Sequence, residues 1–323
     1  MDPIRRRMLC ALAATVFCAS ALAQGYPSRT VRIVVPFPPG GGVDIVARTV
    51  GEKLSARIGQ PVVIDNKPGA GTTIGTEAAA KSAPDGYTLL VGPIGGQAIV
   101  GLMHAKLGFD FRRDFAAVAR IGYGTIALVV PASSRAQSVK DLVALAKANP
   151  GKVTFASSGT GALIHLTGEM FKQAAGIDMT HVPYKGTTQI LPDLLDARVD
   201  MALDSLPAYL PHLKSGKLRA LAVASRTRSS VLPDLPTMAE AGLPGVVSAT
   251  DYGMFAPSGT PKDAIALLNR EVNALLQLAD VKAKLAQSGI EISGSTPDAL
   301  QAEFADEYGK WSKVVRDAGL KAE

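Results

Sequence analysis

Two short segments of small residues have the chemistry to bind an anion through the backbone. The first runs Pro39-Gly40-Gly41-Gly42-Val43, and the second runs Ser157-Ser158-Gly159-Thr160-Gly161. Glycines leave the N–H groups uncovered, and serine and threonine add hydroxyl donors. Residues with helical spacing follow each segment, so each is expected to end at the positive end of a helix dipole. The pair predicts a clamp that holds one anion from both sides without requiring an arginine.

Other chemistries have weaker support in the sequence. Ser157 or Ser158 would be the nucleophile of a secreted serine hydrolase, but this segment lacks the glycine of a Gly-x-Ser-x-Gly elbow, and no base is evident beside it. The three glycines at 40–42 are not followed by Lys-Ser/Thr, which argues against a nucleotide phosphate loop. The histidines have no metal-ligand spacing; they are His104, His165, His181 and His212. We therefore expect no metal, no cofactor and no catalytic residue, and keep a hydrolase as the weaker alternative.

Two polar residues near these segments have structural interpretations. Asp44 falls in the first turn of the first predicted helix, where a carboxylate interacts favourably with the dipole, so a capping role is predicted. His165 falls one turn into the second predicted helix. A packed, hydrogen-bonded histidine is the favoured interpretation, and a role in orienting the loop or a ligand is the alternative.

Units of strand, loop and helix carry both segments. The β-branched run at 31–35 predicts a strand that the following prolines end, and apolar residues then recur with helical spacing from Val43 to Ile58, before Gly59. Further strands are predicted at 61–65, 87–91, 126–130, 153–156, 179–182, 199–203 and 218–223, with residues 92–97 as a loop. This alternation predicts an α/β fold with mostly parallel sheets flanked by helices, in which ligands bind at the carboxyl ends of the strands.

The pattern starts again near Pro131, which predicts two lobes. The first lobe would comprise residues 24–129 and 253–323, and the second residues 130–252. The tail after 253 is mostly helical and has too few strands for a domain of its own, so we expect it to pack on the first lobe. Two crossings between lobes, near Val130-Pro131 and at residues 253–257, would form a hinge.

The N-terminus has the pattern of an export signal. Arg5, Arg6 and Arg7 precede an apolar stretch at 8–22, and Ala21-Leu22-Ala23 is a small-x-small cleavage site. We expect residues 1–23 to be removed after Ala23 and the mature chain to be exported. General secretion is favoured over the twin-arginine route, because Cys10 replaces the usual basic residue after the paired arginines.

Composition narrows the class of protein further. Both cysteines, Cys10 and Cys18, fall in the predicted signal segment, so the mature chain would carry no thiol, disulfide or cysteine ligand. The net charge of +6 over 323 residues is dispersed, and no basic run is interleaved with aromatics in the mature part. This pattern argues against nucleic-acid binding.

Several long blocks resemble the Bug family, the periplasmic solute-binding components of tripartite tricarboxylate transporters. In chain order, from about Tyr26 to Gly319, they include YPSRTVRIVVPFPPGGGVDIVAR, VVIDNKPGAGTTIGTEAAAKSAPDGYTLLVG, FASSGTGALIHLTGEMF, VPYKG, SGKLRALAVASRTRSSVLPDLPTMAEAGLPG and FAPSGTP. The resemblance implies a two-lobed periplasmic-binding-protein, or Venus flytrap, fold. It also implies a monomeric periplasmic protein that captures a small carboxylate-bearing metabolite and delivers it to membrane permease subunits.

The resemblance implies binding residues as well. The carboxylate would be gripped by Pro39, Gly40, Gly41, Gly42 and Val43 of the first loop and by Ser158, Gly159, Thr160 and Gly161 of the second. Val43 stands where many relatives have a hydroxyl residue. The far end of the ligand would meet Gly95, Gln97, Tyr184 and Asp204. A ligand-loaded signalling partner of a membrane sensor kinase is the alternative output, and the identity of the acid stays open.

Overall fold

The computed structural model describes residues 25–103 and 107–317 of the chain. The predicted signal segment at 1–23, its cleavage site after Ala23, and His104 lie outside these ranges. Within the described ranges, no helix is long and apolar enough to cross a membrane.

The first sheet is built around strand β1 (Val31–Val35). Val31, Ile33 and Val35 pack in one hydrophobic cluster and Val34 in another, because successive side chains of a strand point to opposite faces. Strand β1 lies between β2 (Val62–Asn66) and β3 (Thr88–Pro93), and both pairings are parallel. The connecting helices are α2 (Gly42–Ile58), η1 (Ala70–Thr72), α3 (Thr73–Ala80), α4 (Ile94–Met103) and α5 (Phe111–Asp114).

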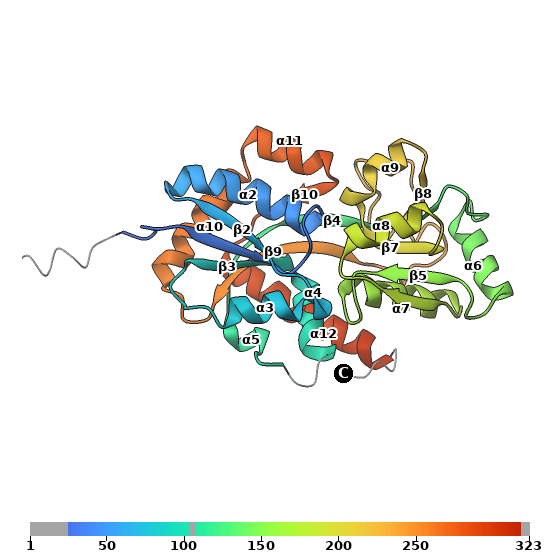
Figure 1. Cartoon of the computed structure of the whole chain (residues 1–323), viewed down its shortest axis with the longest axis horizontal. Helices are drawn as coiled ribbons and strands as arrows, with labels where there is room; N and C mark the ends of the chain where they lie inside the picture. The colour runs from blue at the N-terminus through green and yellow to red at the C-terminus, as the bar shows by residue number, and fades with distance from the viewer. Residues whose placement is uncertain (1–24, 104–106, 318–323) are drawn as a thin grey trace, which may run out of the picture.

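Two long antiparallel strands join the lobes. Strand β9 (Ala249–Pro257) pairs with β3 and with the first part of β4 (Phe115–Pro131). The remainder of β4 pairs with the second sheet, so this one strand passes from one lobe into the other (Figure 1). The sheets are therefore mixed, with parallel strands that carry the loops and antiparallel strands that make the crossing.

The second lobe repeats the parallel arrangement. Strand β5 (Thr154–Ser157) lies between β6 (Thr180–Pro183) and β7 (Met201–Ser205), and both pairings are parallel. Strand β8 (Leu218–Val223) pairs with β4. The helices of this lobe are α6 (Val139–Ala148), α7 (Leu163–Ala175), α8 (Thr187–Leu195), η2 (Leu206–Ala208) and α9 (Leu210–Lys214).

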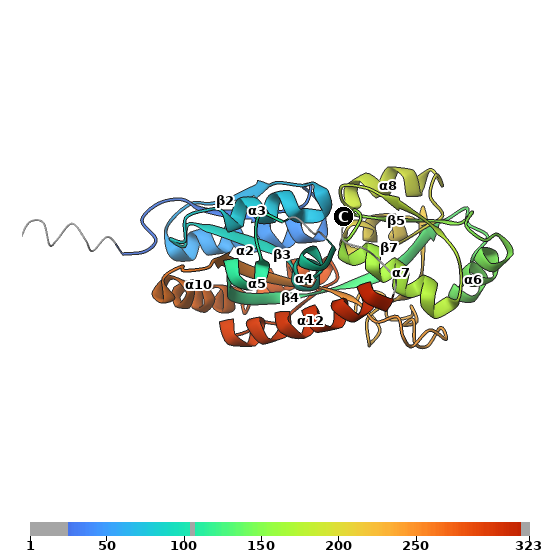
Figure 2. The same cartoon turned by 90° about the horizontal axis from the view of Figure 1, so that it is seen from below.

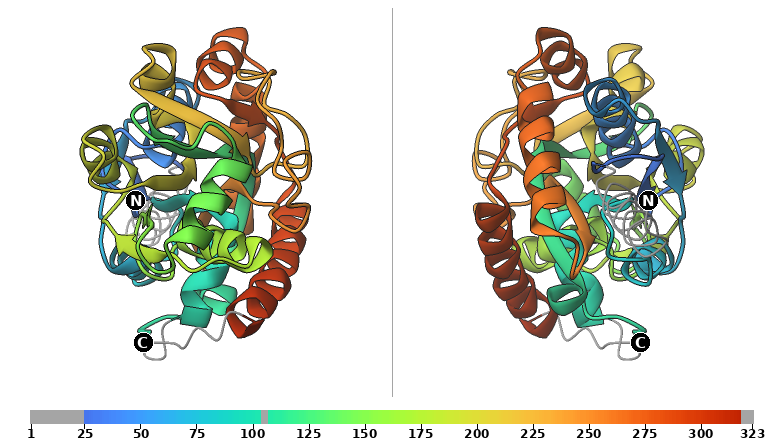
Figure 3. Two further views of the ribbon diagram at one scale, coloured as in Figure 1. Left: turned by 90° about the vertical axis from the view of Figure 1, so that its right-hand side faces the viewer. Right: turned by 90° about the vertical axis from the view of Figure 1, so that its left-hand side faces the viewer.

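The tail packs on the first lobe. Helices α10 (Lys262–Leu275) and α11 (Ala279–Gln287) lie against α2, and β10 (Ile290–Ile292) pairs with β4. Helix α12 (Pro297–Asp317) covers α4 and β4 and extends to α7 of the second lobe (Figure 2). The end-on views in Figure 3 show α12 along one side of the molecule.

The crossings lie earlier in the chain than the sequence pattern indicates. Strand β4 changes partner between Thr125 and Ile126, ahead of the expected boundary at 129/130, and the return falls at Ser248 and Ala249 rather than at 253–257. The start of β4 is hidden because Gly122 interrupts its apolar pattern. A Cβ on Gly122 would lie 2.2 Å from the Glu291 carbonyl oxygen, so the close approach of β10 requires glycine there.

Residues 92–97, predicted as a loop, instead complete β3 and begin α4. Glycine is a poor helix former, and Gly95 and Gly96 hide the helix start. A Cβ on Gly95 would lie 2.6 Å from Glu307 Oε2 and 2.7 Å from Trp311 Nε1, both on α12. The tertiary contact with α12 therefore overrides the local propensity.

Candidate ligand-binding site

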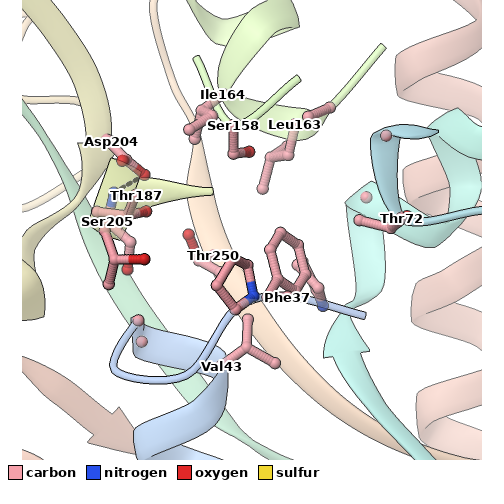
Figure 4. Close-up of a pocket in the computed structure, with 18 residues that line it drawn as sticks. Phe37, Val43, Thr72, Ser158, Leu163, Ile164, Thr187, Asp204, Ser205 and Thr250 are labelled. Carbon is pink, nitrogen blue, oxygen red and sulfur yellow. Dashed lines mark hydrogen bonds between the residues drawn. The ribbon is translucent and has the colours of Figure 1, made fainter. Parts of the chain in front are cut away.

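A cavity lies between the two lobes. Its lining residues come from the carboxyl ends of parallel strands, from the loops and first helix turns that follow them, and from the crossing strand β9 (Figure 4). Those of the first lobe are Phe37, Pro38, Gly41, Gly42, Val43, Gly71, Thr72, Pro93, Gly96 and Thr250. Those of the second lobe are Ser158, Ala162, Leu163, Ile164, Thr187, Thr188, Asp204 and Ser205. An outer pocket adjoins this cavity and shares with it Phe37, Gly71, Thr72 and Ser158.

Asp44 fixes the first loop through its carboxylate. Oδ2 accepts hydrogen bonds from the Gly40 N–H at 2.9 Å and from Arg48 Nε at 2.8 Å, and Oδ1 accepts one from Asn66 Nδ2 at 2.9 Å. Burial opposes ionisation of Asp44, but these donors outweigh burial and hold its pKa below the ordinary value. Asp44 therefore organises the loop from inside the protein, where it uses the Gly40 N–H.

Gly41, Gly42 and Val43, the three residues after Gly40, line the cavity. Gly41 is the N-cap of α2 and provides no side-chain cap, and the first N–H groups of a helix have no intrahelical partner. Within residues 25–103 and 107–317, no acceptor is found for the N–H groups of Gly41, Gly42 or Val43. These groups are available to an anion.

A stacked histidine pair supports the second loop. The Gly161 N–H donates to His165 Nδ1 at 3.1 Å, and the rings of His165 and His181 stack with centroids 3.9 Å apart. Burial, together with the nearby Lys172 charge, lowers the pKa of His165 to about 4. Burial and the neighbouring His165 lower the pKa of His181 to about 3. His165 is thus both packed and responsible for orienting the loop, which unites the two interpretations of the sequence.

Ser157 holds the loop and does not reach the cavity. Its Oγ lies 2.6 Å from His181 Nε2 and 3.1 Å from the Gly159 carbonyl oxygen. The Ser157–His181 distance is that of a nucleophile and a base, but Ser157 is fully buried and lines neither the cavity nor the outer pocket. Ser158, the next residue, lines both.

Three helices begin at the cavity. Helices α2, α7 and α8 start at Gly42, Leu163 and Thr187, and none has a side-chain cap. Their first residues line the cavity, so the positive ends of three dipoles converge there from both lobes. In the described part of the chain, no lysine, arginine or histidine lines this cavity. The arrangement suits an anion held by N–H groups and hydroxyls.

Asp204 is the only acidic side chain that lines the cavity among the described residues. It is 2% exposed, and it accepts hydrogen bonds from the Ser205 N–H at 2.6 Å and from the Tyr209 hydroxyl at 2.9 Å. Burial raises the pKa of Asp204 to about 6, although hydrogen bonds from Thr187, Ser205 and Tyr209 lower it. Its oxygens are engaged by the protein.

The structure gathers some of the predicted binding residues at the cavity and places others elsewhere. Those that line the cavity are Gly41, Gly42, Val43, Ser158 and Asp204. Those that line only the outer pocket are Gly159, Thr160 and Tyr184. The Tyr184 hydroxyl there donates to Asp193 Oδ2 at 2.7 Å. Pro39, Gly40 and Gly161 line neither space; Pro39 and Gly40 are exposed, and Gly161 is buried.

Gly95 and Gln97 also line neither space. Both belong to α4, where Gly95 faces α12 and the fully buried Gln97 Oε1 accepts a hydrogen bond from Thr76 Oγ1 at 3.0 Å. Pro93 and Gly96 of the same segment line the cavity instead. Gly95 and Gln97 differ from the expectation because one is turned toward α12 and the other toward Thr76, both away from the cavity.

Other lining residues were not anticipated from the sequence; they include Phe37, Thr72, Leu163, Thr187, Thr188, Ser205 and Thr250. Thr72 and Thr187 each follow a glycine that precedes a helix, and this local signal repeats the pattern of the two predicted loops. Thr250 has no local signal, because only the pairing of β9 with β4 brings it to the cavity.

Known proteins resemble this chain along most of its length. The sequence profile described as tripartite tricarboxylate transporter family receptor matches residues 46–320. The protein BugT of Bordetella pertussis is 39% identical over 311 residues, which cover 96% of this chain and 95% of BugT. A protein from the tcbD-tcbE intergenic region of Pseudomonas sp. (strain P51) is 39% identical over 322 residues, 98% of this chain and 96% of that protein.

Solved structures share the fold along nearly the whole chain. The periplasmic binding protein BugD has a TM-score of 0.88 and 34% identity, and the match covers 92% of this chain and 100% of BugD. A protein of R. palustris with adipate has a TM-score of 0.89 and 37% identity over 93% of this chain and 100% of that chain. MatC from Rhodopseudomonas palustris with bound malate has a TM-score of 0.86 and 32% identity over 90% of this chain and 100% of MatC. The chain therefore belongs to the family of tripartite tricarboxylate transporter receptors, together with the Bug proteins.

Proposed function

We propose that this chain is a periplasmic solute-binding protein that captures a small carboxylate-bearing metabolite between its lobes and delivers it to a tripartite tricarboxylate-type permease. One observation carries this proposal: three uncapped helix N-termini from both lobes meet at a cavity that no basic side chain lines within the described residues. The adipate and malate in two related structures support a carboxylate ligand.

Capture follows from how the donors are divided between the lobes. The N–H groups of Gly41, Gly42 and Val43 approach the carboxylate from the first lobe, and Ser158 approaches it from the second. A ligand that bonds to both lobes favours the closed arrangement, because only that arrangement offers all the donors at once. Recognition is noncovalent and needs no cofactor.

A charge test at Gly41 examines the clamp. A Cβ at Gly41 meets nothing within 4 Å, and aspartate and asparagine are both good N-cap residues, so Gly41→Asp and Gly41→Asn are expected to fold. A thermal-shift panel of carboxylic acids first finds a ligand, since an acid at 100 Kd adds about 2.7 kcal/mol to the free energy of unfolding. Gly41→Asp should then lose binding through charge repulsion, while the neutral Gly41→Asn of equal size should retain more of it.

Two results would contradict the clamp: no acid in the panel raises the Tm of the wild type, or Gly41→Asp binds like Gly41→Asn. Delivery is tested separately by deleting the gene and measuring uptake of the identified acid. Lost uptake supports transport, whereas intact uptake with lost reporter induction would assign the protein to a membrane sensor.

A further inference from the structure

Two hydroxyls at the cavity have no hydrogen-bond partner in the part of the chain that the structure describes. Among the described residues, four buried side-chain polar atoms are unpaired, and two of these, Thr72 Oγ1 and Thr250 Oγ1, belong to residues that line the cavity. Thr72 is 7% exposed and Thr250 is 4% exposed. A buried donor without an acceptor is unfavourable, and a native protein retains one where a ligand or another group completes the bond.

Thr72 also has a strained backbone. The φ angles of four successive residues are positive: 130° at Gly69, 45° at Ala70, 59° at Gly71 and 87° at Thr72. A β-branched residue rarely adopts the left-handed conformation. Thr72 occupies the N-cap position of α3, yet its hydroxyl makes no capping bond. The strain is therefore not compensated by a local hydrogen bond, and strain of this kind concentrates at functional sites.

Thr72 lies on the side of the cavity opposite the first glycine loop. Figure 4 shows Asp204, Thr187 and Ser205 on one side of the cavity and Thr72 on the other, with Phe37 and Leu163 between them. Gly42 belongs to the side of Ser205, because a Cβ on Gly42 would lie 2.9 Å from Ser205 Oγ. Thr72 lines both the cavity and the outer pocket, so it lies where the two spaces join.

We propose that Thr72 is a specificity-determining residue whose hydroxyl donates a hydrogen bond to an oxygen at the far end of the ligand. The ligand is then a bifunctional acid. One carboxylate lies at the first glycine loop, an apolar stretch lies beside Phe37 and Leu163, and a second oxygen-bearing group lies at Thr72. This inference rests on the proposed function, and it adds a residue and a ligand class to it.

Two ligands that differ only in the second group test this role. Adipate and hexanoate have the same number of carbons, but hexanoate lacks the second carboxylate. Thr72→Val keeps the β-branched shape and the same backbone strain while replacing the hydroxyl by a methyl group. Calorimetry should show that the wild type prefers adipate, that Thr72→Val loses about 10-fold of that preference, and that Thr72→Ser retains it.

Thr250→Val is the matched control, because it makes the same chemical change in the same cavity, between Ser205 and Phe37 in the view of Figure 4. It should change the affinity for both acids by the same factor. If Thr72→Val instead weakens the binding of adipate and of hexanoate by the same factor, Thr72 does not recognise the second carboxylate and the inference is overturned.

The Tm without ligand gives an independent result. Since Thr72 Oγ1 has no partner among residues 25–103 and 107–317, the unliganded Thr72→Val variant should melt at or above the temperature of the wild type. A fall of several degrees would assign the hydroxyl a structural role and overturn the inference. If neither acid binds the wild type nor any other acid in the panel does, the proposed function fails, whereas the unliganded Tm still decides whether the Thr72 hydroxyl is structural.

Discussion

Replacing glycine by alanine is expected to have different effects at two adjacent positions of the first loop, Gly41 and Gly42. At Gly42 a Cβ would lie 2.6 Å from Tyr252 Oη and 2.9 Å from Ser205 Oγ, whereas at Gly41 it would meet nothing within 4 Å. We expect Gly42→Ala to weaken binding of an identified acid by at least about 10-fold and to lower the free energy of unfolding by about 1–3 kcal/mol through overpacking. Gly41→Ala should change both quantities little.

Calorimetry and urea unfolding measure the two effects on this pair. Equal losses of affinity at Gly41 and Gly42 would mean that the space beside Ser205 and Tyr252 is unimportant for the first loop.

Asp44 provides a second prediction at the scale of single residues. Asp44→Asn removes the charge that accepts hydrogen bonds from Gly40, Arg48 and Asn66, so we expect a loss of about 1.5–3 kcal/mol at pH 7. Because the folded pKa of Asp44 is lowered, its contribution is present above the unfolded pKa of about 3.9 and is lost as pH falls through the folded value. The variant should therefore show a shallower loss of stability in acid.

The control for this change is Asp263→Asn, which alters an exposed aspartate in the first turn of α10. Urea unfolding at pH 7 and pH 3 compares the two variants. A comparable loss of stability in Asp44→Asn and Asp263→Asn would show that a negative charge in the first turn of any helix explains the effect.

At the scale of elements, the support of the second loop by β6 and α7 is expected to respond to pH. The pKa values of about 4 for His165 and about 3 for His181 lie below the value of about 6.5 for an exposed histidine. The unfolded chain therefore binds more protons below pH 6.5, and stability should fall as pH decreases from 6.5 toward 4. Asp204, Asp251 and Glu303, whose pKa values burial raises, oppose this trend, so the contribution of the histidines is read from the difference between the wild type and a histidine variant.

His181→Asn should flatten the dependence of the free energy of unfolding on pH between 5 and 7, while His212→Asn, on α9, should leave the dependence unchanged. Chemical denaturation at both pH values supplies the measurement. If the free energy of unfolding of His181→Asn depends on pH as steeply as that of the wild type, the histidine pair does not cause the dependence.

The elements that carry the two loops were predictable because each is a local pattern. An apolar strand, a break of small residues and a helical stripe follow one another at β1 and α2 and again at β5 and α7. These patterns place Gly41, Gly42, Val43 and Ser158 at the cavity.

The start of α4 and the far side of the cavity depend instead on distant contacts. Helix α4 forms despite Gly95 and Gly96 because α12 packs on it, and α12 comes some 200 residues later in the chain. Thr250 reaches the cavity through strand pairing, and the positive φ of Thr72 contradicts the ordinary preference of its residue type. No local pattern carries such information.

At the scale of the whole molecule, the lobes touch through Gly186 and Pro38. A Cβ on Gly186 would lie 2.6 Å from Pro38 Cδ, and the φ of Gly186 is 153°. Gly186→Ala should therefore hinder closure, weaken binding of an identified acid and enlarge the radius of gyration of the protein at saturating ligand. Scattering and calorimetry measure these changes.

Gly216→Ala separates closure from backbone strain. Gly216 also has a positive φ, of 70°, but a Cβ there meets nothing within 4 Å. Both substitutions should cost about 1 kcal/mol or more of stability through strain, yet only Gly186→Ala should alter affinity. A similar loss of affinity in Gly216→Ala would exclude the contact between the lobes as the cause.

The glycine loop has a consequence for how this protein changes during evolution. On the side of the first lobe the proposed grip consists of peptide groups and has no side chain to lose, so substitutions elsewhere in the cavity would leave that part of it in place. Replacing Phe37, Val43 or Leu163 would reshape the walls around an acid that stays anchored. New specificities are therefore reachable in single steps without a non-binding intermediate, and a library randomised at these walls would yield receptors for other acids on an unchanged scaffold.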